Sequence, residues 1–66
     1  MYSIFDSAEL NHCMRNVNSH YKLWTELAWL RDFGMLKSDF VWLTDNRSNE
    51  VYRVSMYDIH EWVAVK

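Results

Sequence analysis

The chain has 66 residues, with 9 acidic and 7 basic side chains, 3 histidines and a formal net charge of −2. Half of the residues are hydrophobic and 17% are aromatic, while the chain holds one glycine, one cysteine and no proline. High apolar content with low net charge excludes an intrinsically disordered chain. A single cysteine excludes a disulfide scaffold and a zinc finger built on several thiolates. We therefore expect one small domain over residues 1–66.

The length of the chain limits the core that it can build. A chain of this size buries only about 60% of its extended surface on folding, so hydrophobic gain and conformational entropy cost are close to each other. Small domains in this position often gain support from a metal, a disulfide or a partner chain. Because the composition gives little basis for the first two, we expect a partner chain, which could be a second copy in a homodimer.

The sequence carries no membrane or export signal that we recognise. No apolar run approaches the roughly 18 residues of a membrane-spanning helix, and the first residues lack the basic and long apolar regions of a signal peptide. The lone Cys13 is compatible with the cytoplasm. Residues 1–33 and 34–66 each carry a net charge of −1 without a basic run, so nucleic acid is not an expected partner.

A first helix is predicted to begin at Asp6. The run Asp-Ser-Ala-Glu from Asp6 to Glu9 matches a capping box, in which the first residue is the N-cap and the fourth reaches back to it. Phe5 and Leu10 would then form a hydrophobic staple. The asparagines within residues 16–18 favour the end of this helix, because asparagine prefers turns and helix ends.

A second helix is predicted over residues 19–33. Its buried stripe repeats at helical spacing and consists of Leu23, Leu27 and Leu30. Trp24 and Ala28 widen this stripe on one side, and Trp29 and Phe33 widen it on the other. Gly34 suits the left-handed position that closes a helix in a Schellman motif.

A β-hairpin is predicted to follow this helix. Residues 40–44 are β-branched and aromatic, residues 45–49 form a polar loop of hairpin length, and residues 50–54 return with alternating polarity. The last segment allows two interpretations. A capping-box pattern from Ser55 to Asp58 favours a short helix over residues 56–63, and the alternative is a third strand through residues 62–65.

The order helix, helix, hairpin, helix predicts an α+β fold with two N-terminal helices, a β-hairpin and a short C-terminal helix. Residues 51–63, VYRVSMYDIHEWV, resemble the wing exit and last helix of excisionase-type winged-helix DNA-binding domains, in which a Tyr-Arg-Val strand leads into a capped helix. The resemblance implies a small winged-helix fold with a recognition helix at about residues 19–33. That helix carries Glu26 and Asp32 where a groove-reading helix normally presents basic or amide side chains.

The groups that could support catalysis are few. His12 and Cys13 are adjacent, so on a helix they would point about 100° apart, and His20 could join them only across a turn. Asp58, His60 and Glu61 bring acid and base groups close together in sequence, without a nucleophile motif beside them. We therefore expect a protein without catalytic activity, metal site or cofactor. A small metal-dependent enzyme is a third hypothesis, after the two given below.

The aromatic side chains are the strongest functional signal. We expect about two-thirds of the eleven to fill the core, since one small core can hardly enclose all of them. Tryptophan and tyrosine left outside are typical of protein-binding hot spots. Trp29 lies at the edge of its helix stripe, and Trp42 alternates away from its strand neighbours. The predicted protein-binding residues are Trp29, Trp42, Phe33, Lys22 and Glu26.

These observations favour a non-catalytic regulator or inhibitor that masks another protein by steric occlusion. The contact would be an aromatic patch with a rim of mixed charge. Many phage-type and mobile-element inhibitors are compact, acidic, single-domain chains of this length without catalytic motifs. This likeness is an analogy with a class of proteins and does not come from particular residues. The alternative is an excisionase-like winged-helix protein that binds DNA and regulates transcription.

Overall fold

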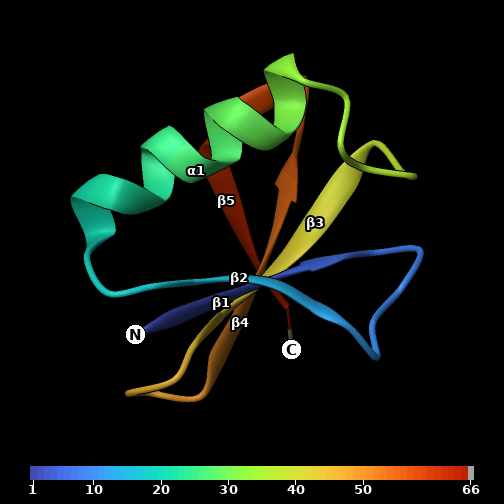
Figure 1. Ribbon diagram of the computed structural model, residues 1–66. Coiled ribbons are helices and arrows are strands. Elements are labelled where there is room, and N and C mark those ends of the chain that lie inside the picture. Colours follow the sequence, from blue (N-terminus) through green and yellow to red (C-terminus); the bar gives the residue numbers. More distant parts are fainter. Residues whose placement is uncertain (66) are drawn as a thin grey trace.

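The computed structural model describes residues 1–65 as an antiparallel sheet with a helix packed on one face (Figure 1). The elements follow the chain as β1 (Tyr2–Asp6), β2 (Cys13–Val17), α1 (His20–Asp32), β3 (Phe40–Asp45), β4 (Glu50–Ser55) and β5 (Asp58–Val65). In this part of the chain, α1 lacks the length that a helix needs to cross a membrane.

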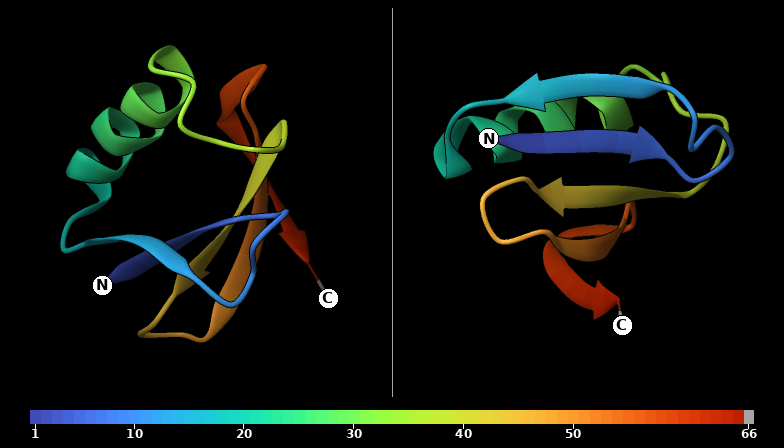
Figure 2. Two further views of the ribbon diagram at one scale, coloured as in Figure 1. Left: turned by 45° about the vertical axis from the view of Figure 1, so that its right-hand side comes forward. Right: turned by 90° about the horizontal axis from the view of Figure 1, so that it is seen from below.

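The five strands lie in the order β2-β1-β3-β4-β5, and every neighbouring pair is antiparallel. A turn joins β1 to β2, α1 then crosses one face, and β3 to β5 follow as a meander on the far side of β1. The sheet is curled, so that α1 contacts both edge strands, β2 and β5 (Figures 1 and 2). The helix therefore closes the open side of the sheet.

The buried hydrophobic residues between α1 and the sheet are all aliphatic. The side chains of Val41 and Leu43 on β3 point toward α1, and Leu27 of α1 belongs to the same buried cluster. All three are fully buried. The buried hydrophobic residues are Ile4, Val17, Leu23, Leu27, Leu30, Val41, Leu43, Val54 and Ile59.

None of the eleven aromatic side chains is buried. Four of them, Tyr21, Trp29, Phe33 and Tyr57, are exposed, and the others are partly covered. The expectation that most aromatic residues fill the core is therefore wrong. Leucine, isoleucine and valine supply all of the fully buried hydrophobic side chains, and Tyr2, Tyr52 and Trp62 pack against this cluster while remaining partly exposed.

The prediction of a helix over residues 19–33 is confirmed by α1. Ser19 is the N-cap, and its Oγ accepts a hydrogen bond of 3.1 Å from the Lys22 backbone N–H. At the other end Gly34 has φ 60°. The Gly34 N–H donates to the Arg31 carbonyl and the Met35 N–H donates to the Leu30 carbonyl, which is the predicted Schellman motif.

The predicted first helix is wrong, because its residues form the end of β1, a turn and β2. Asp6 is the last residue of β1, and its Oδ1 accepts a hydrogen bond of 3.0 Å from the Ala8 N–H. An aspartate holds a tight turn with the same type of bond by which it caps a helix, so the local pattern could not separate the two. Leu10, the proposed staple residue, is 54% exposed.

The predicted hairpin is confirmed by β3 and β4, which pair from Phe40↔Ser55 to Asp45↔Glu50. The predicted C-terminal helix over residues 56–63 is wrong, because Met56 and Tyr57 form a turn and β5 follows. The alternative of a strand through residues 62–65 is confirmed within this longer strand. The Tyr57 N–H donates to the Ser55 Oγ, so the capping-type serine supports a turn.

The α+β arrangement of two N-terminal helices, a hairpin and a C-terminal helix, together with its winged-helix character, is therefore wrong as a description of the fold. The segment that resembles the wing and last helix of excisionase-type domains forms β4, a turn and β5. The helix prediction failed where strand pairing over long sequence separations outweighed local helix signals.

Candidate functional site

The solvent side of α1 carries a pair of exposed aromatic rings. Trp29 is 55% exposed and Phe33 is 64% exposed, and their ring centroids lie 4.6 Å apart. They stand four residues apart, so their side chains are neighbours on the helix surface. Both lie away from the buried side that Leu23, Leu27 and Leu30 form. This pair, which we call the α1 aromatic pair, is a large apolar area in contact with water.

Charged residues flank the α1 aromatic pair. Lys22 and Glu26 precede Trp29 by seven and three residues, which places all of them along one side of the helix. Lys22 is exposed, while Glu26 is half-buried and lies 3.5 Å from the Arg15 side chain of β2. Four of the five predicted binding residues therefore share one stripe, with apolar rings at its C-terminal end and charges at its N-terminal end.

A cavity of about 380 Å³ opens next to the C-terminal end of α1. It lies between this helix end, the segment that leads to β3, and the β4–β5 turn, where Tyr57 is 84% exposed. Its lining residues are Leu30, Arg31, Gly34, Leu36, Ser38, Asp39, Met56 and Tyr57. Gly34 follows Phe33 directly, so the cavity begins where the α1 aromatic pair ends. Its volume is at the lower end of the range for binding pockets, enough for a side chain or two of a partner.

Trp42, the fifth predicted residue, lies on a different surface. It points to the outer face of the sheet, opposite to Val41 and Leu43, and it is partly buried there. On that face it stands between Phe5 of β1 and Arg53 of β4. The structure therefore does not bring Trp42 together with the α1 aromatic pair.

A second aromatic group joins α1 to β5 and has no counterpart among the sequence predictions. Trp24 stacks on Trp62 at 5.0 Å and on His60 at 4.7 Å between ring centroids. His20 packs against Trp62 at 4.9 Å, and its Nδ1 lies 3.4 Å from the Tyr2 hydroxyl. These side chains come from residues about 40 positions apart, so only knowledge of the strand order could have placed them together. Their chief effect is to fasten α1 to the edge of the sheet.

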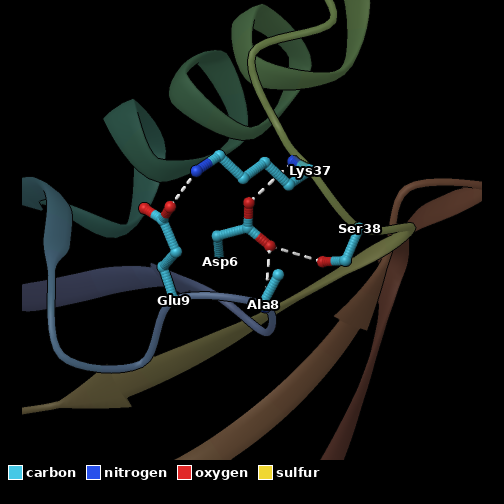
Figure 3. Close-up of polar contacts among 5 residues, drawn as sticks. All are labelled: Asp6, Ala8, Glu9, Lys37 and Ser38. Carbon is cyan, nitrogen blue, oxygen red and sulfur yellow. Dashed lines mark hydrogen bonds and ion pairs between the residues drawn. The ribbon is translucent and has the colours of Figure 1, made fainter.

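The buried carboxylate of Asp6 joins the β1–β2 turn to the segment before β3 (Figure 3). Asp6 is 3% exposed and accepts hydrogen bonds from the Lys37 N–H at 2.7 Å, from the Ala8 N–H and from the Ser38 hydroxyl. Burial raises the pKa of Asp6, but the bonds from Ser38, Ala8 and Lys37 and the Lys37 charge together lower it below the ordinary 3.8. The Lys37 ammonium binds Glu9, and this hydrogen bond raises the pKa of Lys37. The arrangement ties the β1–β2 turn to the segment before β3.

The residues considered for catalysis do not gather in one place. His12 lies exposed in the β1–β2 turn and Cys13 begins β2, whereas His20 begins α1. Asp58, which accepts a hydrogen bond from the His60 N–H, begins β5. Within residues 1–65, no group of three histidine, cysteine or acidic side chains is placed to hold a metal ion.

Comparison with protein-family models, with curated proteins and with solved structures finds no match to this chain.

Proposed function

We propose that this protein is a non-catalytic regulator or inhibitor, of the kind found in phages and mobile elements, that masks another protein by docking with the α1 aromatic pair. One observation carries the proposal: Trp29 and Phe33 are in contact with each other and more than half exposed. Exposed apolar surface of this kind marks interaction sites more often than it serves the fold.

The surroundings of the pair support a protein partner. Tryptophan, tyrosine, methionine and arginine are enriched in interfaces, and Met35, Tyr57 and Arg31 stand near the same helix end as Trp29. The adjacent cavity would receive an apolar side chain of the partner, while Lys22 and Glu26 would form a polar rim. The binding would be steric and would need no cofactor.

The charge pattern favours a protein partner over DNA. Arg15, Arg31 and Lys37 each form an ion pair with a carboxylate of this chain, which partly neutralises their positive charge. A duplex-binding surface needs several cations directed at phosphates. The cytoplasm is the compartment we propose, because a single free thiol suits a reducing environment.

Affinity capture from a lysate of candidate host cells tests this proposal. The wild-type chain is compared with a Trp29→Ser, Phe33→Ser variant and with a Tyr21→Ser control, which removes an exposed ring from the first turn of α1. We expect specific proteins to be retained by the wild type and the control and lost from the double variant. Recovery of the same proteins by all three chains would overturn the proposal, provided that circular dichroism shows all three folded.

A further inference from the structure

The walls of the cavity at the C-terminal end of α1 are held in place by hydrogen bonds of the chain itself. The Met35 N–H donates to the Leu30 carbonyl at 3.2 Å, which closes the helix end. The Met56 N–H donates to the Asp39 carbonyl at 2.8 Å, which joins the segment before β3 to the β4–β5 turn. Because these walls are already in place, little of the chain has to become ordered when a ligand enters, which favours binding.

Apolar side chains form part of the lining. Leu30 is buried in the core, and Leu36 and Met56 pack against the core while remaining partly exposed. The proposed function places an apolar side chain of the partner in this cavity, and these three residues would contact it. The polar part of the lining then determines which group of the partner can lie beside that side chain.

Two of the polar lining residues already have partners within the chain. Arg31 Nε donates to the Asp32 carboxylate at 2.9 Å, and this ion pair partly neutralises the charge of Arg31. The Ser38 hydroxyl donates to the buried carboxylate of Asp6 (Figure 3). Neither side chain therefore requires a charged group on a ligand.

Asp39 is the lining residue whose charge is not balanced in this way. Its side chain is exposed, and within residues 1–65 its carboxylate forms no ion pair. Lys37, two positions earlier, binds Glu9 instead (Figure 3). The C-terminal end of α1 adds partial negative charge, and the exposed ring of Tyr57 also lines the cavity. A carboxylate, a helix C-terminus and an aromatic ring all favour a cation.

We infer that the partner carries an arginine next to the apolar residue that enters the cavity, and that this arginine pairs with Asp39 beside the ring of Tyr57. The inference rests on the proposed function and adds the chemistry of the partner segment. Arginine fits this site better than lysine, because its planar guanidinium binds a carboxylate through two hydrogen bonds and stacks on aromatic rings. Its aliphatic stem would lie along the apolar lining.

Titration of the isotope-labelled full chain with a blocked arginine-leucine-arginine tripeptide, followed by amide chemical shifts, tests the inference. The peptide offers an arginine on each side of the apolar residue. We expect saturable shifts at Gly34, Leu36, Met56 and Tyr57, which line the cavity. A citrulline-leucine-citrulline tripeptide keeps the shape without the charge and should bind about threefold more weakly or less. Absence of saturable shifts at these amides, or equal binding of the two peptides, would overturn the inference.

A pair of charge-matched variants locates the interaction. Asp39→Asn should weaken binding of the arginine peptide about threefold or more and should leave binding of the citrulline peptide unchanged. Glu61→Gln removes the same charge from an exposed position of β5 outside the cavity lining, and it should bind both peptides as the wild type does. Equal losses in the two variants would assign the effect to net charge and would also overturn the inference.

Affinity capture separates this inference from the proposed function. Asp39→Asn should reduce the amount of partner that is retained, whereas the Trp29→Ser, Phe33→Ser variant should lose it. Full retention by Asp39→Asn together with loss from the double variant would overturn the arginine contact and leave the α1 aromatic pair as the docking site.

Discussion

Trp24 of α1 and Trp62 of β5 stack at 5.0 Å between ring centroids, although neither ring is fully buried. The stack fastens the helix to the last strand of the sheet. We therefore expect Trp62→Ala to lower the free energy of unfolding by about 2–3 kcal/mol, somewhat less than for a fully buried ring. Urea unfolding gives this value. His60→Ala, which removes an exposed ring of the group, is the control and should cost about 1 kcal/mol or less.

The α1 aromatic pair should contribute little to stability. We expect Trp29→Ala and Phe33→Ala each to change the free energy of unfolding by about 0.5 kcal/mol or less, as is usual for exposed positions. Leu27→Ala, on the buried side of the same helix, should cost about 2–5 kcal/mol. Thermal unfolding of the three variants checks this contrast. A large loss of stability in the first two would mean that these rings serve the fold and would remove them as binding residues.

Asp6 should make the fold sensitive to acid. Its folded-state pKa lies below the ordinary 3.8, so its stabilising effect is complete above that value and is lost as the pH falls through the folded pKa. Unfolding by urea at a series of pH values from neutral to strongly acidic should show this loss. Asp6→Asn should flatten this acidic dependence and should lower stability at neutral pH by about 1–3 kcal/mol, because buried donors lose a charged acceptor. An unchanged acidic slope in Asp6→Asn would assign the effect to other carboxylates.

Gly34 should be sensitive to substitution for a backbone reason alone. Its φ is 60°, and a β-carbon built at this position would meet no atom within 4 Å. We expect Gly34→Ala to cost about 1 kcal/mol from strain in the left-handed region, and Gly34→Asn to cost less, since asparagine tolerates that region. Thermal unfolding distinguishes the two. Equal effects of alanine and asparagine would point instead to a side-chain clash.

The sequence allowed prediction of those elements whose stabilising contacts are local. α1 carries its cap, its leucine stripe and its closing glycine within its own residues, and the β3–β4 hairpin carries its turn between its strands. β1, β2 and β5 have no comparable stabilising contacts within their own residues. Tyr2–Asp6 depends on pairing with Phe40–Asp45, and Asp58–Val65 depends on β4 and on the stack with Trp24.

The candidate site was predictable to the same extent. Trp29 and Phe33 could be placed at the edge of the helix stripe because helical periodicity fixes their direction. The predicted exposure of Trp29 is confirmed, and Phe33 is exposed beside it. Trp42 was correctly expected to point away from Val41 and Leu43, but nothing in its strand revealed that it lies on the face opposite to α1. The binding role of all these residues stays a prediction.

The aliphatic core also has an optical consequence. Since none of the four indoles is sealed from water, the native protein should already emit at long wavelength, and unfolding should shift its emission maximum only slightly. The close contact of Trp24 with His60 and Trp62 should quench part of the native signal instead. Denaturation would then increase the fluorescence intensity more than it would shift the emission maximum.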